Sequence, residues 1–261
     1  MKDLVKLYSI HSVSGTEGEK EICDWLCSWL DEREYSYVRD GNTLYHIADN
    51  DVMLSAHLDQ VKTNGRAAHI YKEDSYILAY NDKWQRTSLG ADDKNGVWLI
   101  LKMLEEYGEG FDWIISESEE IGCVGIKKIE TELANSIADF CLVLDRKGGY
   151  DILNKGGGTN YCQALAHNLK NFLNDGSDIA TGTYSDTQTV SKYIESVNMS
   201  VSYFNPHSST EYTDYDRLLE IKENIFRILS EPFVHYPSVP EEYQTIPSTS
   251  YSKNWKDYYN V

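Results

Sequence analysis

The spacing of apolar residues along the chain predicts several amphipathic helices. Within residues 16–32, apolar side chains recur every three or four positions, at Ile22, Trp25, Leu26, Trp29 and Leu30. Acidic residues early in this segment favour the N-terminal end of a helix. Residues 94–107 have the same helical character. We expect further helices from near Thr159, around 186–196 and around 214–230.

Other segments have the pattern of β-strands. The runs FDWIIS (111–116) and DFCLVLD (139–145) are short and continuously apolar, which is typical of strands buried on both faces of a sheet. HIYKED (69–74) and YILAYN (76–81) predict a hairpin that turns near Asp74–Ser75. Shorter strands are expected at YSYV, TLYHI, DVMLSAHLD and MSVSYF.

Strands and helices therefore alternate, which predicts an α/β fold. We expect a three-layer α/β/α arrangement in which helices cover both faces of a central mixed, mostly parallel sheet. Residues 1–231 are interpreted as one domain. Residues 232–261 contain four of the five prolines and several tyrosines. They are interpreted as a tail that packs along the surface or contacts a neighbouring molecule.

Composition and charge narrow the classes of partner. The chain of 261 residues carries 42 acidic against 24 basic side chains, a net charge of −18. Such a surface disfavours nucleic acid and anionic membranes as partners. No apolar run reaches the length of a membrane span, and the N-terminus has no apolar signal core, so a cytoplasmic location is expected. The five cysteines form no C-x-x-C pair and are interpreted as small buried apolar residues.

Two polar segments at predicted strand ends have the residue types of a metal site. In MLSAHLD (53–59), His57 and Asp59 are two apart and so face the same side of a strand. Asp59 can then accept a hydrogen bond from the imidazole nitrogen that does not bind metal. In GADDKNG (90–96), the adjacent Asp92 and Asp93 repel each other unless a cation lies between them. A polar strand end and a helix-capping turn are the structural alternatives.

Three further segments end predicted strands. SEEIG (118–122) offers two neighbouring carboxylates, of which one could bind metal while the other takes a proton from water. FCLVLDRKGG places Asp145 at a strand end, and NPHSSTE places His207 after a strand. Each segment alone also fits a surface turn or a cap. Together, imidazole and carboxylate ligands favour zinc, with cobalt or manganese as substitutes.

The order H-x-D, G-A-D-D-K-x-G, E-E-x-G, D and H-S-x-x-E resembles the dizinc exopeptidase clan, which includes peptidase T, tetrahedral aminopeptidases and single-domain leucyl-type aminopeptidases. The resemblance implies that His57 and Asp145 bind one zinc ion and that Glu120 and His207 bind the other. Asp92 would bridge the two ions through a cis peptide to Asp93. Glu119 would be the general base, and Asp59 would support His57.

The chain departs from this family in its spacing. Only about sixty residues separate Asp145 from His207, too few for the lid domain of peptidase T-like relatives. The segment from His57 to Asp92 holds only a hairpin, where tetrahedral aminopeptidases insert a dimerisation domain. We therefore expect a lidless, single-domain catalytic unit, and both large-cage assembly and lid-derived substrate contacts are in doubt. The oligomeric state, including a homo-oligomer, stays open.

Substrate contacts must then come from loops of the same domain. Residues 156–160 (GGGTN) and 182–187 (GTYSDT) are candidates, and Asp186 could hold a substrate amino group. For the glycine run, helix capping is the alternative that we favour.

The activity that this pattern implies is hydrolysis of an amide bond at a peptide terminus, by an aminopeptidase or a dipeptidase. The alternatives are an amidohydrolase that removes the acyl group from an N-acyl amino acid, and a non-catalytic peptide-binding relative.

Overall fold

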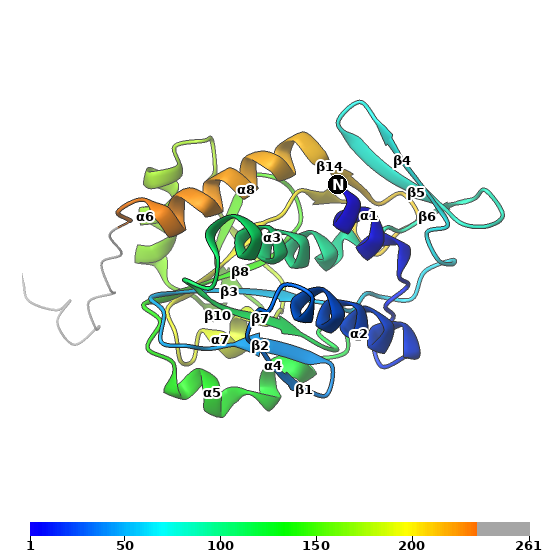
Figure 1. The fold of residues 1–261 in the computed structure, drawn as a ribbon. Helices are drawn as coiled ribbons and strands as arrows, with labels where there is room; N and C mark the ends of the chain where they lie inside the picture. Colours follow the sequence, from blue (N-terminus) through cyan, green and yellow to red (C-terminus); the bar gives the residue numbers. More distant parts are fainter. Residues whose placement is uncertain (234–261) are drawn as a thin grey trace, which may run out of the picture.

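The computed structural model describes residues 1–233, so the predicted tail lies outside the described residues except for its first two. Nine strands form the central sheet (Figure 1). Eight of them follow the order β1 (Val38–Asp40), β2 (Thr43–His46), β7 (Asp112–Ser116), β3 (Val52–His57), β8 (Phe140–Arg146), β12 (Ser196–Ser200), β9 (Asp151–Gly156) and β10 (Thr159–Asn160). The ninth, β11 (Asp178–Gly182), pairs with β9.

The four central strands, β7, β3, β8 and β12, run parallel, whereas β2 and β9 join this group in antiparallel orientation. Helices cover both faces of the sheet (Figure 1). The first face carries α1 (Lys2–Ser9), α2 (Glu17–Asp31), α3 (Ala91–Tyr107), α6 (Gln163–Leu173) and α8 (Tyr215–Ser230). The second face carries α4 (Val124–Lys128), α5 (Glu130–Asn135) and α7 (Thr187–Val190). The predicted α/β fold with a mixed, mostly parallel sheet is confirmed.

The position of strand β8, covered by helices on both faces of the sheet, explains why its sequence is continuously apolar. Leu142 and Leu144 belong to the large buried cluster under α3 and α8, whereas Cys141 and Val143 belong to the smaller cluster under α4 and α5. Successive residues point to opposite faces of a sheet, so a strand covered on both sides has no position for a polar residue. The first carboxylate of the strand, Asp145, appears only at its carboxyl end.

A second, five-stranded sheet lies beside the first. Its order is β13 (Tyr203–Phe204), β14 (Tyr212–Asp214), β5 (Tyr76–Tyr80) and β4 (His69–Glu73), with β6 (Arg86–Thr87) paired to β5. Strands β4 and β5 form the predicted hairpin, with Glu73 opposite Tyr76 across the turn. This sheet positions two loops of the site, because β6 leads into α3 and the β13–β14 connection contains His207.

Several predicted elements differ from the structure; the strand expected at 35–38, for example, shares only Val38 with β1. The helix expected from Thr159 begins at Gln163, because Thr159 and Asn160 pair with β9 across a turn in which Gly157 and Gly158 have positive φ. The glycine run thus makes a hairpin turn, so the helix-capping interpretation is wrong. Of 186–196 only Thr187–Val190 is helical. The strand expected at 199–204 is divided between the two sheets, since the chain turns at Ser202, which has a φ of 64°.

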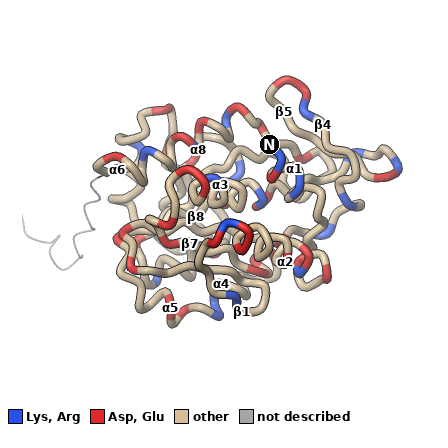
Figure 2. Tube along the Cα trace, viewed as in Figure 1, with Lys and Arg blue, Asp and Glu red and all other residues tan. Residues whose placement is uncertain are grey.

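Charged residues are distributed along the whole trace, and acidic ones predominate (Figure 2). Within residues 1–233, none of the helices is both long enough and apolar enough to cross a membrane.

Candidate metal centre

The seven predicted site residues come from five separate segments and meet at one end of the central sheet. His57 is the last residue of β3, Glu119 and Glu120 follow β7, and Asp145 is next to last in β8. Asp92 lies in the first turn of α3, and His207 lies between β13 and β14. Because β3, β7 and β8 are parallel neighbours, their carboxyl ends open at the same edge, which is where α/β folds form sites.

The first group of potential ligands contains His57, Asp92 and Asp145. The Nε2 atom of His57 is 3.3 Å from Oδ1 of Asp92 and 3.6 Å from Oδ1 of Asp145. The three ligand atoms all lie within 4.8 Å of one another. His57 and Asp92 are buried, so this group is closed to solvent on the side of the sheet.

The second group contains Asp92, Glu120 and His207. The Nε2 atom of His207 is 3.2 Å from Oδ2 of Asp92 and 3.0 Å from Oε1 of Glu120. Asp92 thus turns one oxygen to each histidine and belongs to both groups. A carboxylate with this arrangement can bridge two cations, and the mixed nitrogen and oxygen donors suit zinc. The residues present therefore fit a pair of divalent ions.

The backbone around Asp92 is fixed by buried polar contacts. The Asp92–Asp93 peptide is cis, as the resemblance implied. Oδ2 of Asp93 accepts a hydrogen bond from the His57 amide at 3.1 Å, and its Oδ1 accepts one from the Gly96 amide at 3.1 Å. The Nζ atom of Lys94 donates to the carbonyl of Ile10 at 2.5 Å and to the side chain of Gln60 at 2.6 Å. These bonds attach the start of α3 to β3 and to the N-terminal segment.

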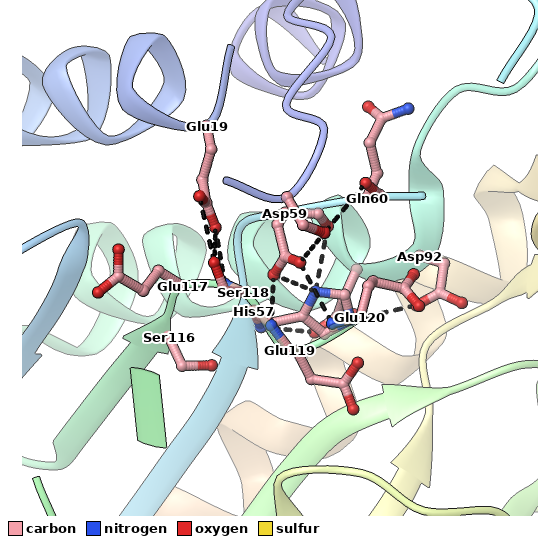
Figure 3. Close-up of polar contacts among 12 residues, drawn as sticks. Glu19, His57, Asp59, Gln60, Asp92, Ser116, Glu117, Ser118, Glu119 and Glu120 are labelled. Carbon is pink, nitrogen blue, oxygen red and sulfur yellow. Dashed lines mark hydrogen bonds and ion pairs between the residues drawn. The ribbon is translucent and has the colours of Figure 1, made fainter. Parts of the chain in front are cut away.

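Asp59 connects two of the predicted segments (Figure 3). Its Oδ1 lies 3.3 Å from Nδ1 of His57 and accepts a hydrogen bond from the Glu119 amide at 2.9 Å. Its Oδ2 accepts bonds from the hydroxyl of Ser14 at 2.6 Å and from the Glu120 amide at 3.2 Å. One buried carboxylate therefore orients the imidazole and also positions the backbone of the two glutamates.

Glu119 lines the cavity at this site together with Asp92, Glu120, Asp145 and His207, and the cavity volume is ≈ 260 Å³. Burial raises the pKa of Glu119 to about 9; nearby His57 lowers it, while the carboxylates of Asp145, Asp186 and Glu120 raise it further. A carboxyl group of this kind takes up a proton readily. Cations bound at the two groups would lower this pKa, since positive charge stabilises the carboxylate form.

The histidines show how strongly the site favours positive charge. Hydrogen bonds to Asp92 and Glu120 raise the pKa of His207 to about 10. Burial alone would lower the pKa of His57, but the carboxylates of Asp145, Asp59 and Asp92 raise it well above its usual range. Burial also raises the pKa of Asp145 to about 7. Without bound cations, protons on the imidazoles take over part of the charge compensation that a metal pair would provide.

Several supporting residues were not predicted from the sequence. Glu19 of α2 accepts hydrogen bonds from the amide of Ser118 at 2.6 Å and from its hydroxyl at 3.0 Å, which fixes the turn before Glu119 (Figure 3). Glu211 accepts bonds from the Ser88 hydroxyl at 2.6 Å and from the Ala91 amide at 3.2 Å. Glu211 was visible as the last residue of H-S-x-x-E, whereas nothing in the α2 pattern distinguished Glu19 from surface glutamates.

Asp186 does not lie where a substrate amino group would reach it. Its side chain is 2% exposed and accepts a hydrogen bond from the hydroxyl of Ser116, on β7. The neighbouring residues Thr183, Tyr184 and Ser185 do line the cavity. Of the loop over 182–187, residues 183–185 therefore border the site.

No family model matches the chain, and no curated protein matches it. Solved structures match over most of its length. The aminopeptidase PepT from Bacillus cereus has a TM-score of 0.71 and 16% sequence identity, covering 87% of this chain and 96% of that one. The chain has the fold of this peptidase. The fold expected from the resemblance to dizinc exopeptidases is thus confirmed.

Two further solved structures match the chain over most of its length. A tripeptidase from Staphylococcus aureus has a TM-score of 0.69 and 16% identity, covering 87% of this chain and 95% of its own. An aminopeptidase from the archaeon Desulfurococcus kamchatkensis has a TM-score of 0.66 and 16% identity, covering 89% and 94%.

Proposed function

We propose that this protein is a dinuclear zinc-dependent hydrolase that cleaves an amide bond at a peptide terminus, as an aminopeptidase or a dipeptidase. The observation that carries this proposal is the pair of ligand groups that share Asp92. A single structural zinc site would need no shared carboxylate, and a structural site is closed, whereas both groups border a cavity.

In this proposal His57 and Asp145 hold one ion, Glu120 and His207 hold the other, and Asp92 binds both. Ions bound there act as Lewis acids, polarising a carbonyl group and making water more acidic. Asp59 keeps the His57 imidazole oriented with Nε2 toward the ion, because it lies beside the other ring nitrogen. Strands β3 and β8 fix the backbones of His57 and Asp145.

Glu119 is the general base in this proposal. It lies in the cavity wall next to Glu120 but belongs to neither of the two ligand groups, so its carboxylate is free to accept a proton. It takes the proton from the attacking water and gives it to the leaving amine. The hydrogen bond from the Glu119 amide to Asp59 keeps the base in register with the metal ligands.

The substrate is a peptide end, bound by loops of the same domain. Besides the acidic residues, the cavity is lined by Thr183, Tyr184, Ser185 and Leu153. The peptidase names of the structures with this fold support a peptide over other amides. The acyl group of an N-acyl amino acid offers the same scissile bond and is the competing substrate class.

The test combines metal analysis with a substrate panel. Purified protein is loaded with zinc, its metal content is measured, and aminoacyl anilides, dipeptides and N-acyl amino acids are compared. We expect two zinc ions per chain and turnover of the substrates with a free amino terminus. Turnover of N-acyl amino acids alone would make the protein a deacylase. Full zinc loading without any turnover would indicate a peptide-binding protein.

A further inference from the structure

A third group of potential ligands adjoins the two described above and has no role in the proposed reaction. It consists of Glu119, Cys123 and Asp186, whose ligand atoms all lie within 4.8 Å of one another. Glu119 faces the cavity, and the other two residues lie behind it, buried between the sheet and α4. The group therefore contacts the cavity only through the proposed general base.

The contacts within this group leave one ligand atom without a partner. Sγ of Cys123, a fully buried residue, is 3.5 Å from Oε1 of Glu119. Asp186 uses one carboxylate oxygen, Oδ2, to accept the hydrogen bond from Ser116. Its other oxygen, Oδ1, has no hydrogen-bond partner among the described residues although the side chain is 2% exposed. A buried carboxylate oxygen without a partner is costly and is a position where a cation is stabilising.

The charge balance also favours a cation. Two carboxyl groups and a thiol share this space, and the positive group that acts on both carboxyls is the His57 imidazole, which is itself a proposed metal ligand. One sulfur and two carboxylate oxygens form a donor set that suits zinc and cadmium better than calcium or magnesium, because the thiolate is a soft ligand.

We propose that Glu119, Cys123 and Asp186 form a third, inhibitory site for a thiophilic divalent cation such as Zn²⁺ or Cd²⁺. On binding, the Cys123 thiol releases its proton to solvent and a metal–sulfur bond forms. The ion also engages the Glu119 carboxylate, which then cannot accept a proton from water. The inhibitory effect rests on the proposed function, whereas the metal site itself does not. Excess zinc therefore inhibits the enzyme that two zinc ions activate.

Cobalt absorption tests the site without reference to activity. Neither of the two main ligand groups contains a cysteine, so a thiolate-to-cobalt charge-transfer band in the near ultraviolet that depends on Cys123 reports on the third group. Chelator-treated protein is titrated with Co²⁺. We expect the band to grow with the third equivalent in the wild type and in the control Cys27→Ser, a cysteine on α2 far from the group in the sequence. It is expected to be absent in Cys123→Ser.

The same variants are then titrated with zinc, and each activity is normalised to the variant's own value at two equivalents. We expect Cys123→Ser to need roughly tenfold more zinc than the wild type for half-inhibition, and Cys27→Ser to behave as the wild type. Absence of the band in wild-type protein at three equivalents overturns the proposal, whether or not the variants fold. A band that persists in Cys123→Ser overturns it as well.

The two proposals fail in different ways. If the dinuclear centre is wrong, the wild type does not bind two ions through the main groups. The charge-transfer band still appears, but with the first or second equivalent of Co²⁺. If the third site is wrong, two ions bind and support turnover, and the band does not appear.

Discussion

At the scale of single residues, Asp92 is the side chain that the two main ligand groups share. Its two oxygens face His57 and His207 separately, at 3.3 and 3.2 Å. We predict that Asp92→Asn loses both ions and retains almost no zinc after gel filtration, because the amide lacks the negative charge that both ions need. His207→Gln should lose only the ion of the second group. Elemental analysis distinguishes the two variants, and equal zinc contents would contradict a bridging role.

Glu119 should affect turnover without affecting metal content. Removing a general base typically costs about 10²–10⁴-fold in rate. We therefore predict that Glu119→Gln lowers kcat/KM by this order, with kcat reduced and two zinc ions per chain still bound, because the side chain belongs to neither of the two main ligand groups. The measurement is steady-state kinetics on the best substrate of the panel, with thermal melting as the control for folding. A variant as active as the wild type would exclude Glu119 as the base.

At the scale of elements, the approach of α3 to β8 determines how closely Asp92 and Asp145 can lie. A Cβ atom on Gly96 would come within 2.2 Å of the Leu144 carbonyl oxygen, a backbone atom of β8. We predict that Gly96→Ala pushes the helix away from the strand, destabilises the protein by about 1–3 kcal/mol and weakens zinc binding. Gly110→Ala is the matched control, since its new Cβ meets only the movable ring of Tyr107. Chemical denaturation measures the free energy of unfolding of both variants, and equal values would contradict the prediction.

The sequence predicts those elements whose local pattern of apolar residues is compatible with one type of secondary structure only. The runs at 111–116 and 139–145 correspond to β7 and β8, and the helical spacing at 16–32 corresponds to α2, because burial on two faces or on one face leaves different patterns. The glycines at 156–158 are compatible with a cap or a turn, and only the pairing of β10 with β9 decides. The pairing of β14 with β5 joins residues far apart in the chain, which no local pattern reveals.

The site shows the same division. That strand-end residues from several segments would meet could be expected, since parallel strands end at one edge. The hydrogen bonds of Asp59 to the Glu119 and Glu120 amides depend on how two loops fold against each other, and the sequence gives no sign of them. The burial of Asp186 also depends on tertiary packing. Its position follows from the packing of α7 against the sheet, and a helix of four residues is too short to be predicted from its sequence pattern.

At the scale of the whole molecule, the boundary of the folded unit can be tested. Phe233 packs against Phe140 and Phe172, with ring centroids 5.3 and 5.1 Å apart. The predicted domain boundary after residue 231 would remove this contact. We predict that a chain ending at residue 231 melts at a lower temperature than a chain ending at residue 233, because it lacks the Phe233 ring. Calorimetry of the two proteins decides, and equal melting temperatures would show that Phe233 does not stabilise the fold.

The acidic charge of the molecule and the cluster of carboxylates at its site predict that metal binding stabilises the folded protein. Carboxylates of Asp92, Glu120 and Asp145 converge at one place in a chain whose net charge is already −18. In the absence of cations, protons on His57 and His207 compensate part of this charge. Ions that bind only the folded state stabilise it further by mass action. Free zinc at a hundred times its dissociation constant contributes about 2.7 kcal/mol per site.

For a domain of this size, that free energy corresponds to a rise in Tm of about 5–10 °C per site. We predict that chelator-treated protein melts lower than zinc-loaded protein by at least this amount, and that adding zinc restores the difference. Asp92→Asn should melt at one temperature with or without zinc, because it lacks the shared ligand. Calcium at the same concentration serves as the control cation, since it prefers six to eight oxygen ligands and disfavours imidazole. A Tm that is independent of zinc in the wild type would mean that the converging side chains do not bind the ion, and the hydrolase proposal would lose its physical basis.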